Sequence, residues 1–425
     1  MAVKYCIKSI NKSHGAHTLS DIWIVDDVFP VSETSLLDKK LSESGYWVKL
    51  VNVDDQVRVP VRYLLADKNL VSHTGFISED DGLISSGRAY HVNWSHPEFK
   101  REIRYANSNQ TQSIWFLTEN TQTAVNRNHE IEEDIAREYE EILNMIQAKE
   151  IPESTLLLDH EYLKNPIISL HVMNVGQGDT IVLRFPGNKI WLIDAYLHSK
   201  QYQHVICITE FVDWLKREYP GFVIERFIVS HLHYDHIKSA LSIIKTLPIQ
   251  TVIFSHTPVG MTMTALKLLR EACVRNILCV LRGKESMTKS GFGFSLVAAS
   301  NLAKKANSSD QNHHGIIMDV VTKKSHLLLP GDASWDQIDE FLSRSYASIK
   351  DLAKYYKVTH HCSHTGYDTH FFTRYNPSHA FTSCSSGNRY GHPDTDTRKE
   401  IDLLTKGNHI ITSEINRKSV DVSIQ

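Results

Sequence analysis

The sequence predicts an α/β protein in which a smaller, mainly β N-terminal domain precedes a larger domain of sheets covered by helices. Its length of 425 residues is enough for two domains, since one domain takes roughly 150 residues. Residues 1–120 contain short β-branched and aromatic runs separated by Gly, Asn and Ser, a pattern typical of strands. After Pro166, apolar strand-like runs alternate with amphipathic helical runs, which is typical of helix-covered sheets.

Changes of pattern along the chain indicate the domain boundaries. We expect a β-rich domain at residues 1–128, a helical connector at residues 129–165 and the second domain at residues 166–425. In the connector, apolar residues recur at helical spacing among acidic ones, which predicts a helix over residues 129–150. In the N-terminal domain, strands are expected at Asp21–Val25, Tyr46–Val53 and Val57–Leu65.

The elements of the second domain follow from the same periodicities. Its expected strands are Ile168–Val175, Thr180–Arg184, Ile190–Ile193, Phe227–Ser230, Thr251–Ser255, Ile277–Leu281, Gly315–Val321, His326–Leu329, Ile410–Ser413 and Val420–Ile424. Its expected helices are Thr209–Glu218, Met261–Arg275, Ser334–Ser345 and Thr395–Thr405. The polar stretch Asn301–Asn312 is expected to be a loop.

Composition argues against several classes of protein. The six cysteines include no Cys-x-x-Cys pair, which fits neither a disulfide framework nor a structural zinc finger. No apolar run approaches the roughly 18 residues of a membrane span, and the N-terminus lacks a secretory signal. We therefore expect a cytoplasmic protein without membrane contact. The net charge of −3 does not indicate a nucleic-acid coat.

Charge differs between the two parts of the chain. Residues 1–150 carry 16 Lys and Arg against 23 Asp and Glu, whereas residues 151–425 carry 30 against 26. This difference suggests separate folding units with different partners.

The strongest chemical signal is the run Ser230–His236 (SHLHYDH), which lies between an apolar strand and a helix. It offers four potential metal ligands on one turn. His231 and His233, two residues apart, can reach one metal, while Asp235 and His236 turn toward a second. Nitrogen and oxygen ligands of this kind suit Zn²⁺, Mn²⁺ and Fe, and we expect two divalent metal ions, Zn or Mn.

Two later stretches supply what a two-metal site still needs. Asp332 follows an apolar strand and a glycine, which is the right place for a carboxylate that bridges two metals. His360 and His361 follow another strand and add two imidazoles. Either stretch alone would be a weak signal, since Gly-Asp after a strand is most often a turn. Their order after the histidine cluster strengthens both.

Six ordered motifs can now be compared with known families. They are Asn174–Asp179 (NVGQGD), Leu192–Ala195 (LIDA), Ser230–His236, Pro330–Ala333 (PGDA), His360–Ser363 (HHCS) and Asn388–Pro393 (NRYGHP). Together they resemble the metallo-β-lactamase superfamily and, more narrowly, the hydrolase domain of bacterial DNA-uptake competence proteins and its stand-alone relatives. The resemblance covers residues 166–425. It implies an αββα sandwich whose metal site lies in the loops along one edge of the two sheets.

The resemblance also implies roles for individual residues. The implied ligands are His231 and His233 for the first metal, Asp235, His236 and His361 for the second, and Asp332 as the bridge. His360 would touch a substrate phosphate, although the roles of His360 and His361 could be exchanged. Asp194 resembles a buried aspartate that orients the histidine loop, and Asp179 is expected to shape a tight turn near the site.

Four stretches depart from the pattern of the superfamily, and one of them, Ser385–Gly387, precedes the Asn388–Pro393 motif without disrupting it. Where another histidine usually completes the first metal site, this chain has both His313 and His314, and either could serve. Lys238 and Ser239 replace two glycines, and a surface position for Lys238 is favoured over contact with an anionic substrate. Cys362 stands where glycine is usual.

The leading hypothesis is a metal-dependent phosphodiesterase or nuclease that uses a metal-activated water. Besides the metal ligand Asp235, His360 and His392 are the catalytic candidates, for phosphate contact and protonation of the leaving group. Arg389 and Tyr390 are candidates for substrate binding. The expected substrate is a phosphodiester, either nucleic acid or a small nucleotide, and the lack of a clear basic tract argues against processive cleavage.

Two alternatives belong to other classes. The chain could hydrolyse a carboxyl ester or thioester, as other members of the superfamily do. It could also be a partner-gated or non-catalytic interaction protein, recruited by a protein partner through the acidic N-terminal domain.

Overall fold

The computed structural model describes the following parts of the chain. In the N-terminal third these are residues 22–30, 45–52, 61–67, 89–92, 100–104, 111–117, 125–127, 140–142 and 144. Beyond it they are residues 151–152, 167–198, 204–256, 262–289, 292–299, 302, 311–385 and 392–425. The chain divides into two compact units, residues 1–142 with 258–270 and residues 143–257 with 271–425. The domain boundaries expected from the sequence stay a prediction.

The first unit contains a seven-stranded sheet with the order β5-β6-β3-β2-β1-β4-β7. Its strands are β1 (Ile22–Pro30), β2 (Gly45–Asn52), β3 (Val61–Asp67), β4 (Ala89–Val92), β5 (Lys100–Arg104), β6 (Thr111–Leu117) and β7 (Val125–Arg127). Two central strands contribute buried apolar side chains, Val48 and Leu50 from β2 and Leu64 and Ala66 from β3. The mainly β character predicted for this part of the chain is therefore confirmed.

The second unit begins with a mixed sheet in the order β13-β12-β11-β10-β9-β8-β21. Its strands are β8 (Ile168–Met173), β9 (Ile181–Phe185), β10 (Lys189–Ile193), β11 (Val223–Ile228), β12 (Ile249–Ser255), β13 (Leu278–Leu281) and β21 (Ser419–Ile424). Strands β10 to β13 are parallel, and β8 runs in the same direction because it and β10 are both antiparallel to β9.

A second mixed sheet of this unit has the order β14-β15-β16-β17-β18-β19-β20. Its strands are β14 (Lys284–Lys289), β15 (Phe292–Ala298), β16 (Ile316–Val321), β17 (Ser325–Leu329), β18 (Ala353–Lys357), β19 (His379–Thr382) and β20 (His409–Ile411). Strands β17 to β20 are parallel. All five residues of β17 are buried, as expected for a strand that is covered on both faces.

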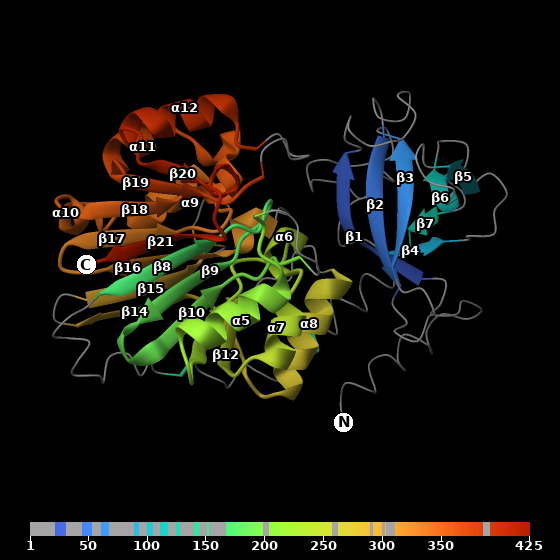
Figure 1. Cartoon of the computed structure of the whole chain (residues 1–425), viewed down its shortest axis with the longest axis horizontal. Coiled ribbons are helices and arrows are strands. Elements are labelled where there is room, and N and C mark those ends of the chain that lie inside the picture. Colours follow the sequence, from blue (N-terminus) through green and yellow to red (C-terminus); the bar gives the residue numbers. More distant parts are fainter. Residues whose placement is uncertain are drawn as a thin grey trace. The chain divides into compact units, whose positions relative to one another are not determined.

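Helices cover the outer faces of the two sheets (Figure 1). Helices α5 (Ile208–Glu218) and α7 (Ala240–Thr246) lie outside the first sheet, and α9 (Trp335–Leu342), α11 (Thr369–Tyr375) and α12 (Thr395–Leu404) lie outside the second. The remaining α-helices for which bounds are described are α6 (Tyr234–Ile237), α8 (Met263–Val274) and α10 (Tyr346–Ile349). The αββα layer order implied by the sequence motifs is thus confirmed.

Two apolar clusters hold these layers together. Between the sheets, Trp191 of β10 packs edge-on against Phe294 of β15, with ring centroids 5.0 Å apart. Outside the second sheet, Ile338, Phe372 and Ile401 bring α9, α11 and α12 into one cluster with the sheet. Burying each such side chain stabilises the fold by about 1.5–3 kcal/mol, so both layers are strongly fixed behind the loops at their edge.

The structure also differs from the sequence prediction in several elements. Strand β14 was not predicted, because Lys284–Lys289 is mostly polar. Strand β15 was not predicted either, although Phe292–Ala298 is mostly apolar. The expected helix Ser334–Ser345 is confirmed as α9 but ends earlier, at Leu342, and the separate short helix α10 follows it. Of the helix expected at residues 129–150, only residues 140–142 and 144 are described, and these are helical. Most of the loop expected at Asn301–Asn312 lies outside the described residues, and residues 311–314 form a 3-10 turn.

Within the described residues, no helix is both long enough and apolar enough to cross a membrane.

Candidate metal centre

The candidate site lies at one edge of the sandwich, where strands of both sheets end. Asp179, Asp194 and the run Ser230–His236 follow strands β8, β10 and β11, which share one direction. Asp332 follows β17 and His361 follows β18, and these two strands are parallel. Because the carboxyl ends of parallel strands meet at one edge of a sheet, the fold brings together residues that are far apart in the sequence.

Asp194 holds the run Ser230–His236, called the histidine loop here, through hydrogen bonds to its first and last residues. The Oδ1 atom of Asp194 accepts the Ser230 backbone N–H at 2.7 Å, and Oδ2 accepts the Ser230 hydroxyl at 2.6 Å. Nδ1 of His236 donates to the same Oδ2 at 2.7 Å. This contact leaves Nε2 of His236 as the nitrogen that can bind a metal, which is the usual arrangement for a ligating histidine. Asp194 is buried, and its backbone φ is +57°.

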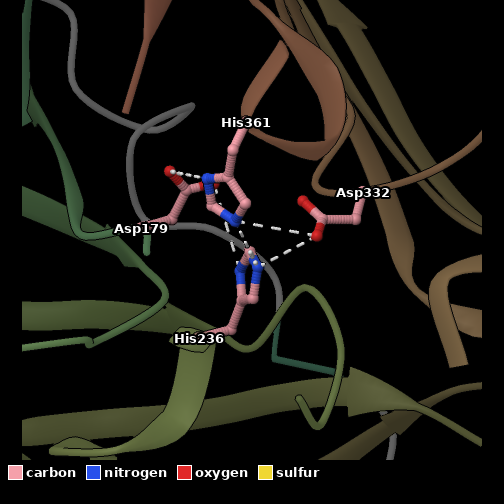
Figure 2. A group of neighbouring side chains, drawn as sticks. All are labelled: Asp179, His236, Asp332 and His361. Carbon is pink, nitrogen blue, oxygen red and sulfur yellow. Dashed lines mark hydrogen bonds and ion pairs between the residues drawn. The ribbon is translucent and has the colours of Figure 1, made fainter. Parts of the chain in front are cut away.

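The Nε2 atoms of three histidines converge on Asp332. Oδ2 of Asp332 lies 3.3 Å from Nε2 of His236, 3.7 Å from that of His361 and 3.7 Å from that of His231. The Nε2 atoms of His236 and His361 are 3.3 Å apart. Figure 2 shows His236 and His361 facing the Asp332 carboxylate, which comes from the other side of the centre. Asp235 joins them, with Oδ2 3.4 Å from Nε2 of His361.

These separations fit a metal centre. Ligand atoms that lie about 2.0–2.1 Å from Zn²⁺ in a tetrahedron are about 3.3 Å from one another. Oδ1 of Asp332 is buried and has no hydrogen-bond partner among the described residues. A buried carboxylate oxygen in this state is costly unless a cation or donor faces it. The donor set of imidazole nitrogen and carboxylate oxygen is suitable for Zn²⁺, Mn²⁺ or Fe.

The second histidine pair is held by an unusual turn. His360, His361 and Cys362 all have positive φ, at 48°, 51° and 66°. The Thr359 hydroxyl donates to the backbone oxygens of Gly331 and Ala333, which ties this turn to the loop that carries Asp332. Nδ1 of His361 donates to the Ser383 carbonyl at 2.8 Å, and because a carbonyl only accepts, Nε2 of His361 is left to bind a metal.

Electrostatic effects at the centre favour positive charge. Burial lowers the pKa of His236, but the carboxylates of Asp332, Asp194 and Asp235 outweigh it and raise that pKa well above its ordinary value. Burial alone would raise the pKa of Asp332, yet the neighbouring imidazoles, His236 first, hold it well below its usual range. Burial and the neighbouring His236 lower the pKa of His231. The same carboxylates that stabilise an imidazolium here would also stabilise a divalent cation.

The remaining histidines expected at the first metal are His233 and one of the pair His313 and His314. Nδ1 of His233 lies 3.0 Å from Nε2 of His231, so these two side chains are together. His313 and His314 lie in the turn that leads into β16, and the Ile316 N–H donates to Ser230 O at 2.6 Å. This bond puts their segment beside the histidine loop.

The residues expected to contact substrate lie around the more open part of the centre. His360 is 26% exposed, with Nε2 4.0 Å from Oδ2 of Asp332. Its ring centroid is 5.4 Å from that of His392, whose Nδ1 is 3.4 Å from Nε2 of Gln177. Burial, then His360 and His361, lower the pKa of His392 to about 3, so this imidazole is neutral near pH 7. Arg389 and Tyr390 lie outside the described residues.

Three further residues at the site received no role from the sequence. Gln177 contacts His392, and Ser230 connects Asp194 to the histidine loop. Lys357 is buried, and its Nζ donates to Oδ2 of Asp179 at 2.8 Å. Gln177 lies in a motif that signalled the site, but a lysine three residues before a histidine pair carries no such signal. For Lys238, which stands where the superfamily has a glycine, the structure shows a cation–π contact, with Nζ 4.5 Å from the centroid of the Tyr196 ring.

No family model and no curated protein sequence matches this chain. Similar solved structures include an isothiocyanate hydrolase from Delia radicum gut bacteria, at 13% identity and a TM-score of 0.39, over 61% of this chain and 100% of that one. Another is CmlA, a diiron beta-hydroxylase from Streptomyces venezuelae, at 10% identity and a TM-score of 0.37. That match covers 60% of this chain and 54% of the hydroxylase, so this chain spans about half of that protein's length. Likeness at such low TM-scores carries no information about chemistry, so the function proposed for this chain depends on the geometry of its own site.

Proposed function

We propose that the chain is a metal-dependent hydrolase and, more narrowly, a phosphodiesterase that uses two divalent ions. The observation that carries this proposal is the convergence of the Nε2 atoms of His231, His236 and His361 on Oδ2 of Asp332, at 3.3–3.7 Å. In this proposal His231 and His233 would hold one ion, and Asp235, His236 and His361 would hold the other. Oδ2 of Asp332 is near His231 of the first group and near His236 and His361 of the second, so Asp332 would serve both.

The protein contributes position and charge to this reaction. Bound ions would supply a water of lowered pKa as nucleophile and positive charge opposite the phosphoryl oxygens. Asp194 and the Ser383 carbonyl fix the tautomers of His236 and His361, so that both Nε2 lone pairs are directed into the centre. The burial of Asp332 and His361 excludes bulk water from this part of the site and strengthens the interactions there.

His360 and His392 are proposed to act on the substrate. His360 is the more exposed of the histidine pair and lies at the edge of the centre, where it can donate a hydrogen bond to a phosphoryl oxygen or a proton to the leaving oxygen. His392, neutral near pH 7, is better suited to hydrogen bonding than to donating a proton in the reaction. Gln177 orients His392 through its Nδ1 atom.

The proposed substrate is a short or single-stranded nucleic acid or a small nucleotide. The motif set resembles that of competence-type hydrolases, and residues 151–425 carry 30 Lys and Arg against 26 Asp and Glu. This slight positive balance suits a small anionic substrate better than a long duplex, which needs an extended basic surface.

The test is hydrolysis of bis(p-nitrophenyl) phosphate by the full chain with Mn²⁺ or Zn²⁺ added. Asp332→Asn should reduce turnover about 100-fold or more, because the amide cannot balance the charge of two ions. Asp319→Asn is the matched control, since Asp319 is also a buried carboxylate, 3.2 Å from an imidazole nitrogen of His326 but outside the site. This control should keep its turnover.

The same protein samples should be offered thioesters, lactones and cyclic nucleotides. Turnover of a thioester or lactone, with none of any phosphodiester, would replace the proposed reaction by carboxyl-ester hydrolysis. Equal phosphodiesterase activity in wild type and Asp332→Asn would overturn the assignment of the site.

A further inference from the structure

A buried ion pair connects the two sheets directly behind the metal centre. Lys357 is the last residue of β18 in the second sheet, and Asp179 lies in the loop between β8 and β9 of the first. Lys357 Nζ is 2.8 Å from Oδ2 of Asp179, and both side chains are at most 2% exposed. Nζ also donates to the backbone oxygen of Val358 at 3.2 Å. A charge-assisted bond at this depth is strong only because both partners are present.

Asp179 lies on the opposite side of the two central histidines from Asp332 (Figure 2). It is near their Nδ1 atoms, with Oδ1 3.9 Å from that of His361 and Oδ2 4.0 Å from that of His236. Both Nδ1 atoms already have closer partners, the Ser383 carbonyl and Asp194. The Nε2 atoms, by contrast, face Asp332 and Asp235. Asp179 therefore lies behind the histidines, outside the ligand set argued above.

The position of this ion pair matters because the ligands come from both sheets. His236 belongs to the first sheet's loops, whereas Asp332 and His361 belong to the second's. The contacts of His236 with Asp332 and His361 are contacts between ligands, and a bound metal would bring these ligands together anyway. The Lys357–Asp179 ion pair joins the same two edges without using any ligand.

We propose that Lys357 is a positioning residue that, through Asp179, holds the two sheet edges at ligand spacing before a metal binds. The inference depends on the metal centre of the proposed function but not on its substrate. Backbone contacts of Asp179 extend the effect, because its N–H donates to the Asp235 carbonyl at 3.1 Å. Lys357 thus reaches the histidine loop through one side chain and one peptide group.

The experiment measures Zn²⁺ and Mn²⁺ binding to the metal-free full chain by titration calorimetry, and the thermal unfolding of each variant without metal. Lys357→Met should lower metal affinity about 10- to 100-fold, the usual effect of removing a residue that supports ligands, and should lower the unfolding temperature without metal. Lys357→Arg, which keeps the positive charge, should recover most of the affinity. The Asp179→Asn/Lys357→Met double variant should lose no more affinity than the worse single variant, because both act through one contact.

Lys354→Met is the matched control. Lys354 lies on the same strand and is also buried, but its Nζ donates to the backbone oxygens of Lys350 and Leu352, away from the centre. This control should lower the unfolding temperature and leave metal affinity unchanged. A merely structural lysine at position 357 would behave in the same way as Lys354.

Wild-type metal affinity in folded Lys357→Met would overturn the inference, as would losses that add in the double variant. If Lys357→Met does not fold, Asp179→Asn carries the test, and unchanged affinity in that variant is the contrary result. None of these measurements uses turnover. Wild-type protein that binds metal but hydrolyses no phosphodiester would therefore refute the proposed reaction and leave this inference in place.

Discussion

The two halves of the metal centre reach the same ligand spacing by different means. In the first half, Ser230–His236, the side chain of Asp194 holds the loop through three hydrogen bonds of 2.6–2.7 Å. In the second half, Thr359–Cys362, the backbone itself takes the unusual shape, with positive φ at three consecutive residues. A half held by one side chain can be loosened by a single isosteric change. In a half that is held by its backbone, a single substitution should mainly lower the free energy of unfolding and change metal affinity less.

The largest effect is expected where the loop Asn174–Asp179 packs against the first half. Gly178 has φ +139°, and a Cβ there would lie 2.5 Å from the backbone oxygen of Asp235 and 2.6 Å from the Tyr196 ring. Gly178→Ala should therefore reduce the free energy of unfolding by about 3 kcal/mol, measured by urea denaturation. Gly176→Ala is the control, since that glycine also has positive φ but no atom nearer than 3.8 Å, and it should cost about 1 kcal/mol. Equal losses would show that the close packing does not constrain the loop.

The next effect concerns the side chain that holds the first half. Asp194→Asn keeps the shape of the residue but removes the charge that binds Ser230 and His236. Affinity for Zn²⁺ should fall about 10- to 100-fold, because His236 loses the partner that directs its Nε2 atom. Calorimetric titration of the metal-free variant measures this. Affinity equal to that of wild type would mean that the loop is shaped by its backbone, like the second half.

A smaller effect is expected from the corresponding support of the second half. Thr359→Val removes the hydroxyl that donates to the carbonyls of Gly331 and Ala333 and keeps a similar volume. The free energy of unfolding should fall by about 1–3 kcal/mol, since the Ala333 carbonyl loses this donor, whereas the Gly331 carbonyl keeps the His360 N–H. The fall in metal affinity should be smaller than for Asp194→Asn. Thr359→Ser, which keeps the hydroxyl, should retain most of the stability, and the reverse order of affinities would contradict the comparison.

The smallest effect is expected at Cys362. Its φ of +66° favours glycine, while its completely buried side chain packs in the outer apolar cluster. Cys362→Gly relieves the backbone and loses the packing, two effects of about 1 kcal/mol each with opposite sign. The net change in unfolding free energy should be less than about 1 kcal/mol by urea denaturation. A loss of several kcal/mol would show that packing of the thiol, more than backbone shape, holds this turn.

The same contrast explains what could be predicted from the sequence. His231, His233, Asp235 and His236 stand within six residues, so their chemistry is visible without any fold. Asp332 could be assigned because a strongly apolar strand precedes it, and His361 because its motif resembles that of a known superfamily. The Lys357–Asp179 ion pair could not be predicted, because it joins residues 178 positions apart that meet only when the two sheets pack. The weakly apolar strand β14 escaped prediction for a related reason, since its pairing with β15 is a property of the sheet.

The most direct measurement of the central claim is the metal content of the purified chain. Wild type and Asp332→Asn should be saturated with Zn²⁺ or Mn²⁺, dialysed and analysed by inductively coupled plasma mass spectrometry. We predict close to two ions per wild-type chain and a clear loss of metal in Asp332→Asn, with both proteins folded by circular dichroism. Folded wild-type protein that retains no metal, or a variant that retains as much as wild type, would contradict the account.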